Sequence, residues 1–136
     1  MPEIIGIAHV ELSVRDLEAS VRWYSRLFEA EEVFRGANAE EHFKAVAIRE
    51  PRSKIVLAFT QHDEVREAPF TPRRTGLDHL SFAVADRVAL ESWEARLRDI
   101  GIDHDGIADY GTHTALTFKD PDGIALEMVA RAPRAA

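Results

Sequence analysis

An internal repeat constrains the fold of this chain more than any other feature of its sequence. When the sequence is compared with itself at an offset of 70 positions, residues of the same type coincide without gaps. The coinciding pairs are His9 and His79, Val14 and Val84, Asp16 and Asp86, Ala19 and Ala89, Trp23 and Trp93, Arg26 and Arg96, and Leu27 and Leu97. A fixed offset of this kind indicates that one supersecondary unit occurs twice.

The pattern inside each repeat predicts the same order of elements. Apolar residues alternate at a period of two in residues 4–14 and 77–84, which is typical of strands. Asp16 and Asp86 then suit the N-cap of a helix. Three strands are expected after each helix: 31–35, 43–49 and 54–60 in the first repeat, and 105–110, 115–118 and 124–129 in the second. We therefore predict an α+β fold of two tandem βαβββ modules, forming a curved mixed sheet around a cleft.

We expect residues 1–136 to form a single domain with an internal boundary. Module 1 is expected at residues 1–62 and module 2 at residues 76–136, because each range holds one complete repeat. The charged and proline-containing stretch at 63–75 has the composition of a linker.

A hairpin near the C-terminus carries the most unusual side chain. Asp120-Pro121-Asp122-Gly123 has the residue types of a tight turn, and apolar residues alternate on both sides of it. Glu127 lies in the middle of the outgoing apolar strand. Burial of a lone carboxylate is costly, so Glu127 must reach water, pair with a cation or bind a metal.

Composition narrows the classes of function. The chain has no cysteine, so thiolate chemistry is excluded and any metal must be held by histidine, carboxylate or water. Its net charge is −7 and no long basic cluster occurs, which argues against nucleic acid as a partner. No apolar run is long enough to span a membrane, and the first residues lack the features of a signal peptide, so we expect a cytoplasmic protein.

The repeat itself suggests a metal site. His9 and His79 are equivalent, while the position 70 residues before Glu127 is Leu57. If the two modules pair about a pseudo-twofold axis, one cleft receives His9, His79 and Glu127. Two imidazoles and one carboxylate hold a divalent metal and leave coordination sites open for a substrate. The simpler alternative is that the histidines form hydrogen bonds and that Glu127 faces solvent.

Three segments resemble the vicinal oxygen chelate superfamily, also called the glyoxalase/bleomycin-resistance/extradiol-dioxygenase proteins. They read IAHVELSVRDLEASVRWYSRLF, GLDHLSFAV and DPDGIALEMV. The resemblance implies that His9, His79 and Glu127 bind one divalent metal ion, of which iron, zinc, manganese, nickel and cobalt are candidates. It also implies a small-molecule substrate and a homodimer in which two subunits often contribute modules to one site.

The sequence departs from parts of this family. Members with glyoxalase I activity carry Glu or Gln at the position matching Leu57, which cannot bind a metal, so that activity is doubtful. Gln61 and His62 are candidates for a displaced fourth ligand. Drug-binding members without a metal lack the His and Glu ligands that this chain has, which disfavours a purely sequestering role.

The remaining candidates concern catalysis and substrate binding. Strand parity places His113 on the same face as Glu127, where a neutral imidazole acts as a general base. Gly111-Thr112-His113-Thr114 also resembles a segment of extradiol dioxygenases that holds an acid/base histidine. The candidate substrate-binding residues are Glu11, Phe43, Leu57, Phe59 and Tyr110, with Phe43, Leu57 and Phe59 expected to form an apolar wall.

These observations lead to one principal hypothesis and two alternatives. The principal hypothesis is a metal-dependent lyase, isomerase or extradiol-type dioxygenase that binds two neighbouring oxygens of a small organic molecule. One alternative is a dimer that sequesters a drug in the same cleft without catalysis. The other is thiol addition to an epoxide antibiotic, which requires a cationic phosphonate site and a potassium-binding loop that we do not identify in the sequence.

Overall fold

The computed structural model describes residues 1–64 and 68–133. The chain forms two compact units, Met1–Ala68 (unit 1) and Pro69–Ala136 (unit 2), and each contains one βαβββ repeat. The α+β class and the duplicated architecture are therefore confirmed. Residues 65–67 of the expected linker and the last three residues of module 2 lie outside the described residues. No described helix has both the length and the apolar character needed to cross a membrane.

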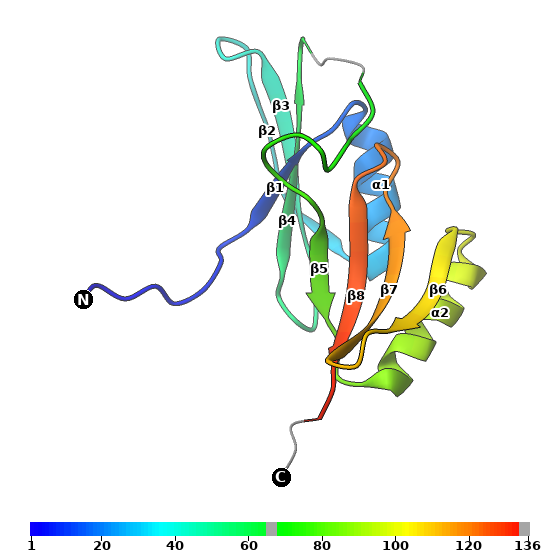
Figure 1. Cartoon of the computed structure of the whole chain (residues 1–136). Coiled ribbons are helices and arrows are strands. Elements are labelled where there is room, and N and C mark those ends of the chain that lie inside the picture. Colours follow the sequence, from blue (N-terminus) through cyan, green and yellow to red (C-terminus); the bar gives the residue numbers. More distant parts are fainter. Residues whose placement is uncertain (65–67, 134–136) are drawn as a thin grey trace. The chain divides into compact units, whose positions relative to one another are not determined.

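Unit 1 is a four-stranded mixed sheet covered on one face by a helix (Figure 1). Strand β1 pairs in parallel with β4, and β4, β3 and β2 are antiparallel neighbours. Helix α1 contacts β3 and β4. The elements are β1 (Val10–Ser13), α1 (Leu17–Phe28), β2 (Glu31–Asn38), β3 (Phe43–Arg49) and β4 (Val56–His62).

Unit 2 repeats this topology, with the strand order β5-β8-β7-β6. Strand β5 pairs in parallel with β8, and the other pairs are antiparallel. Helix α2 contacts β6, β7 and β8 on one face of the sheet. The elements are β5 (Leu80–Ala83), α2 (Arg87–Asp99), β6 (His104–Asp109), β7 (His113–Lys119) and β8 (Ala125–Arg131).

Both helices begin at the aspartates expected from the sequence. The Asp16 carboxylate accepts a hydrogen bond from the Ala19 backbone N–H, and Asp86 does the same for Ala89. Each cap satisfies a backbone donor that has no partner within its helix. The helices bury apolar side chains against one face of each sheet, which leaves the opposite face without a covering helix within the unit.

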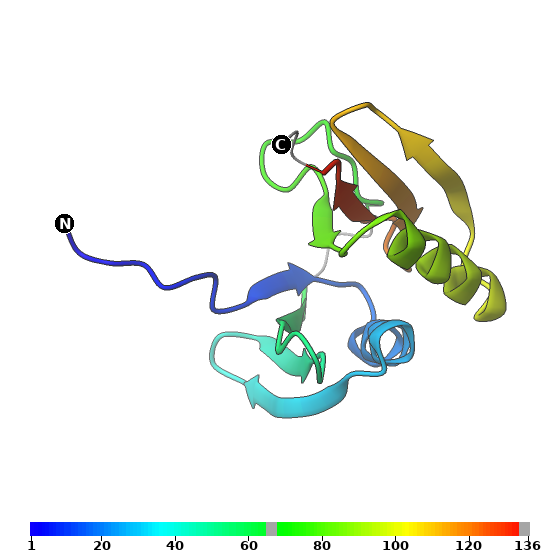
Figure 2. The ribbon, with the colours of Figure 1, turned by 90° about the horizontal axis from the view of Figure 1, so that it is seen from below.

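The first strand is shorter than its alternating pattern indicates. We expected a strand over residues 4–14, but β1 covers only Val10–Ser13, and the chain before it runs as an extended segment (Figure 2). Ile4, Ile5 and Ile7 are almost fully exposed. The reason is pairing, because β1 pairs with β4 only from Val10 onwards, and an alternating sequence needs a neighbouring strand to form a ladder.

The pairing register corrects the equivalence drawn from a uniform offset. Val10 is paired with Leu57, whereas its counterpart Leu80 is paired with Leu126. The structural equivalent of Glu127 is therefore Ala58 and not Leu57. The cause is a connection of different length, since residues 50–55 join β3 to β4 and the shorter segment 120–124 joins β7 to β8. Ala58 has no metal-binding atom either, so no fourth ligand lies at this position.

Candidate metal and substrate site

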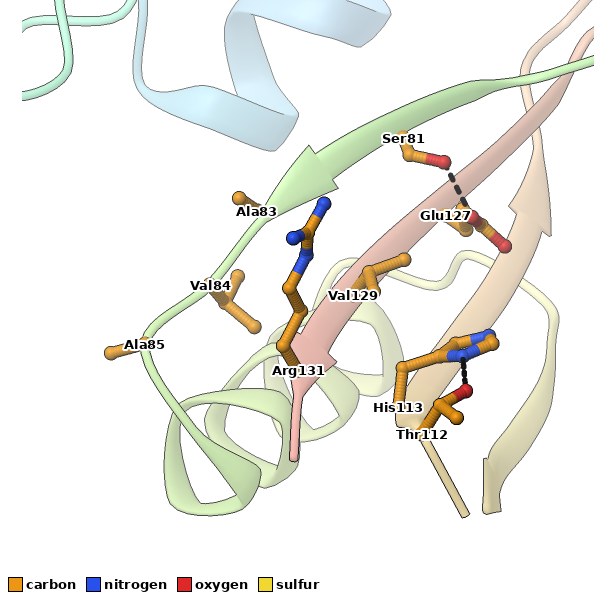
Figure 3. A pocket seen from close by; sticks show the side chains of 9 residues that line it. All are labelled: Ser81, Ala83, Val84, Ala85, Thr112, His113, Glu127, Val129 and Arg131. Atoms are coloured by element: carbon orange, nitrogen blue, oxygen red, sulfur yellow. Dashed lines mark hydrogen bonds between the residues drawn. The ribbon is translucent and has the colours of Figure 1, made fainter. Parts of the chain in front are cut away.

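The helix-free face of unit 2 contains a pocket of about 720 Å³ (Figure 3). Side chains from β5, β7 and β8 surround it, together with residues directly before β7. Those that bear on its chemistry are Ser81, Thr112, His113, Glu127, Val129 and Arg131. The pocket therefore combines a carboxylate, an imidazole, a guanidinium and two hydroxyl groups on an apolar floor.

Glu127 lies at the centre of this face because β8 is the second strand of the sheet, between β5 and β7. Its paired neighbours are Ser81 on β5 and Thr117 on β7. The Ser81 hydroxyl donates a hydrogen bond to the Glu127 carboxylate, and the side chain of Glu127 is only 18% exposed. The carboxylate is thus held in a defined position at the surface of the sheet.

His79 stands directly before β5 and faces the same carboxylate. Its Nε2 atom lies 3.3 Å from Oε1 of Glu127, and its Nδ1 atom lies 2.7 Å from Oδ1 of Asp78. The hydrogen bond with Asp78 raises the pKa of His79 above its usual value, partial burial opposes the rise, and the charge of Glu127 adds to it. Asp78 was not among the candidates from the sequence, although an acidic residue beside a candidate ligand histidine is a usable signal.

This arrangement fits one part of a metal site. A ring that donates Nδ1–H to a carboxylate keeps the lone pair of Nε2 available, which is the usual arrangement behind a metal-binding histidine. His79 and Glu127 then present one nitrogen and two oxygens toward a common point. Among the described residues, neither unit by itself gathers three histidine or carboxylate side chains that could hold a metal. His9 belongs to unit 1 and directly precedes β1, as His79 directly precedes β5.

His113 lies on the same face as Glu127 and lines the same pocket. The Tyr110 ring is stacked on the His113 ring, with centroids 5.0 Å apart and an angle of 22° between the planes. The Thr112 hydroxyl lies 2.9 Å from Nδ1 of His113. These two contacts restrain the orientation of the imidazole while His113 remains at the pocket.

The expected apolar wall from unit 1 does not form as one surface. Phe59 is fully buried, and its ring lies 4.6 Å from that of Tyr24 on α1, so it belongs to the helix-covered core. Leu57 has the same strand parity and is 3% exposed. Phe43 lies on the opposite face, 6.0 Å from the ring of His62. The expectation is therefore wrong for Leu57 and Phe59 as wall residues, because β4 turns its odd-numbered side chains toward α1.

Three further candidates from unit 1 have clear positions. The side-chain oxygen of Gln61 accepts a hydrogen bond of 2.8 Å from the backbone N–H of Leu17, so it serves the start of α1. His62 is exposed at the end of β4. Glu11 is exposed on β1 and is paired with Ala58, which makes it the counterpart of Ser81. No fourth ligand is evident from these positions.

Arg131 is a pocket residue that the sequence analysis missed. It is the last residue of β8 and is paired with His113. An arginine close to the C-terminus of a sequence carries no pattern of its own, and only the strand register brings it to the pocket.

Comparisons with known proteins were made on both sequence and structure. The family model described as the Glyoxalase/Bleomycin resistance protein/Dioxygenase superfamily matches residues 6–128. The metallothiol transferase FosB of Bacillus licheniformis is 27% identical over 133 residues, which is 93% of this chain and 75% of that protein. Catechol-2,3-dioxygenase of Bacillus subtilis is 31% identical over 130 residues, which is 94% of this chain but only 42% of that protein.

Solved structures agree with these matches. A glyoxylase/bleomycin resistance protein/dioxygenase domain from Frankia sp. EAN1pec superimposes with a TM-score of 0.86 at 32% identity, covering 96% of this chain and all of that one. The fosfomycin resistance protein FosX of Listeria monocytogenes superimposes with a TM-score of 0.69 at 18% identity, covering 96% of each chain, a likeness that shows a shared fold alone. The chain therefore belongs to the glyoxalase/bleomycin resistance protein/dioxygenase superfamily.

Proposed function

We propose that this chain is a metal-dependent enzyme whose substrate is a small organic molecule with two neighbouring oxygen atoms. In this proposal His9, His79 and Glu127 bind one divalent ion, and His113 is the acid/base residue. The observation that carries the proposal is the environment of His79, whose Nδ1 atom is engaged by Asp78 while Nε2 is directed at the Glu127 carboxylate.

The residues around the pocket have distinct tasks in this proposal. A divalent ion held by these residues would supply Lewis acidity to the two substrate oxygens. Ser81 holds the Glu127 carboxylate through its hydroxyl hydrogen bond, so the ligand does not have to be reoriented when the metal binds. His113 accepts or returns a substrate proton at Nε2, because its Nδ1 atom faces Thr112 and its ring is packed against Tyr110.

Two curated relatives support metal-dependent chemistry of different kinds. One is named as a metallothiol transferase and the other as a catechol dioxygenase. Both are consistent with a small-molecule substrate, and they differ in the reaction that follows binding. The proposal therefore concerns the step that unites them, which is metal-assisted binding of an oxygenated substrate.

Sequestration of a drug without catalysis is the competing function. A binding protein needs the pocket but has no use for a hydrogen-bonded histidine and carboxylate directed at one point. Metal content separates the two functions, because sequestration of this kind proceeds without a metal.

The test is the metal content of the purified protein and its response to two substitutions. We expect about one divalent ion per wild-type chain, and strongly reduced content in Glu127→Gln and His79→Ala. Glu91→Gln is the matched control, because Glu91 is an exposed carboxylate on α2 and pairs with Arg87. Light scattering on the same preparations is expected to give a homodimer.

Two results would contradict the proposal. The first is wild-type protein that holds no metal and takes up none when Fe²⁺, Mn²⁺, Ni²⁺, Co²⁺ or Zn²⁺ is added. The second is a Glu127→Gln variant whose metal content equals that of the wild type and of the Glu91→Gln control. That result would mean that Glu127 is not a metal ligand.

A further inference from the structure

Two hydroxyl groups flank Glu127 in the sheet, and they direct their protons differently. Ser81 on β5 and Thr117 on β7 are the paired neighbours of Glu127, and β7 lies between β8 and β6 (Figure 1). The Ser81 hydroxyl donates a hydrogen bond to Oε1 of Glu127. The Thr117 hydroxyl instead donates to Oδ2 of Asp105 on β6, at 2.9 Å. A hydroxyl has a single proton, so Thr117 cannot donate to Glu127 while it is bonded to Asp105.

A β-bulge brings Asp105 to this position. The pairing of β6 with β7 is irregular between His104 and Ile107. As a result the two intervening residues, Asp105 and Gly106, lie opposite the single residue Thr117. Gly106 has a φ of 78°, which glycine adopts readily, and its N–H donates a 3.1 Å hydrogen bond to Nδ1 of His104. The bulge is therefore held by local contacts, and it presents the Asp105 carboxylate to Thr117.

Unit 1 shows that the fold does not require this pair of side chains. Its edge strand β2 also has an irregularity in its pairing with β3. The residue equivalent to Thr117 is Ala47, which is paired with Phe34 and has no hydroxyl group. The hydroxyl and carboxylate pair therefore accompanies Glu127 and is not needed to build the sheet.

The two oxygens of the Glu127 carboxylate consequently have different surroundings. Oε1 accepts the hydrogen bond from Ser81 and lies 3.3 Å from Nε2 of His79. Within residues 1–64 and 68–133, no group donates a hydrogen bond to Oε2. Paired residues have Cβ atoms about 4.5–5.5 Å apart, so a different χ1 rotamer of Thr117 would turn its hydroxyl from β6 toward this carboxylate.

We propose that Asp105 is a positioning residue that holds the Thr117 hydroxyl away from Glu127 and so keeps Oε2 of that carboxylate free for a divalent ion. This inference rests on the proposed function, because it takes Glu127 as a metal ligand. Without the acceptor on Asp105, the Thr117 hydroxyl is free to donate to the Glu127 carboxylate. An ion then has to displace that hydrogen bond before it binds.

The first experiment measures Zn²⁺ affinity by competition with a metal-binding dye in four variants. Asp105→Ala is expected to weaken binding about 10-fold, because hydrogen bonds to charged groups contribute on that scale. Asp105→Asn keeps an acceptor oxygen, so its affinity is expected to stay within about 2-fold of the wild type. Thr117→Val alone should likewise change little. The double variant Asp105→Ala/Thr117→Val is expected to regain the wild-type affinity, because it has no hydroxyl that competes with the ion.

The second experiment follows the Thr117 side chain by nuclear magnetic resonance in metal-free protein. Couplings from Cγ2 to the backbone nitrogen and carbonyl carbon report χ1. We expect one rotamer in the wild type and in Asp105→Asn, and a different or averaged rotamer in Asp105→Ala. Asp103→Ala is the matched control, because it removes an exposed carboxylate directly before β6. It is expected to change neither the couplings nor the Zn²⁺ affinity.

Three results would overturn this inference. Equal losses of affinity in Asp105→Asn and Asp105→Ala would mean that the charge of Asp105 matters and its hydrogen bond does not. A double variant that binds as weakly as Asp105→Ala would mean that Asp105 does not act through Thr117, and so would an unchanged χ1 in Asp105→Ala. Absence of uptake of every divalent ion by the wild type is a different failure. It would contradict the proposed function and with it the role in ion binding, while the couplings would still show whether Asp105 directs the Thr117 hydroxyl.

Discussion

The two units share one topology and differ on the faces that their helices leave open. In unit 2 the paired row across three strands is Ser81, Glu127 and Thr117, and in unit 1 the equivalent row is Glu11, Ala58 and Ala47. At the strand ends, unit 2 has His113 and Arg131 where unit 1 has Phe43 and His62. The duplicated scaffold has therefore kept its helix-packed residues apolar while its open faces have become chemically different.

This difference shows that the residues that stabilise the fold and the residues that could bind a ligand lie on opposite faces of the sheet. The helix-covered faces of both units are built from large buried side chains, including Phe59 in unit 1 and the equivalent Met128 in unit 2. The titratable pair of His79 and Glu127 lies in one unit only. A substitution on the covered face should therefore affect stability in either unit, while a substitution on the open face should affect ligand binding through unit 2.

The largest effect, on the free energy of unfolding, is expected from substitutions on the helix-covered faces of the two sheets. Phe59→Ala should lower the free energy of unfolding by about 3–5 kcal/mol, because it leaves a cavity beside Tyr24, and Met128→Ala should cost about 2–5 kcal/mol. Denaturant titration followed by circular dichroism measures both. Phe34→Ala is the matched control, since Phe34 is 59% exposed and its loss should change stability by less than about 1 kcal/mol. A cost for Phe59→Ala as small as that of the control would place Phe59 outside the core.

A smaller effect, on metal affinity, is expected from a substitution of Asp78, whose carboxylate contacts Nδ1 of His79. Unit 1 has Ala8 where unit 2 has Asp78, so only one of the two equivalent histidines has a carboxylate on its Nδ1 side. Asp78→Asn should weaken metal binding about 10–100-fold without removing it, because the ring loses a partner that holds its orientation. Competition with a metal-binding dye measures the change.

Asp103→Asn is the control for this prediction, since Asp103 is exposed in the loop after α2. Equal affinity in Asp78→Asn and the wild type would mean that the hydrogen bond does not position His79 for a metal.

The smallest effect is expected at the surface of unit 1, where Arg35 pairs with Glu18 of α1. The hydrogen bond from Arg35 lowers the pKa of Glu18 below its ordinary value of 4.5. The stabilisation is therefore complete above that ordinary value and is lost as the pH falls through the lower folded value. We expect Glu18→Gln to be slightly less stable than the wild type at pH 7, with the difference vanishing in acid and shrinking at high salt. Thermal unfolding at several pH values tests this, and a difference that grows in acid would reverse the sign of the linkage.

Much of the fold was predictable because its signals are local. The Asp120 turn is an example, since the Asp120 carboxylate accepts hydrogen bonds from the backbone N–H groups of Asp122 and Ile124, and Gly123 has a φ of 80° that only glycine adopts readily. The helix caps are equally local. These elements depend on residues within a few positions of one another, so sequence patterns reveal them.

The errors arose where position depends on pairing across the sheet. A uniform offset of 70 aligned Glu127 with Leu57, but the longer β3–β4 connection shifts the true equivalent to Ala58. The same register turns Phe59 toward α1 and brings Arg131 beside His113. A shift of one residue in the register reverses the face of every side chain, and a single offset cannot account for connections of different length.

The parallel pairing of β5 with β8 has a consequence for the order of assembly. Antiparallel neighbours such as β7 and β8 meet through a short turn, but β5 and β8 meet only after helix α2 and two strands have been traversed. Closing that long loop costs chain entropy before any contact compensates for it. His79 and Glu127 are adjacent only when this last pairing is complete, so an ion held by both binds the finished sheet and not its precursors. By mass action, an ion bound at the proposed site should then raise the folded fraction of unit 2 at equilibrium.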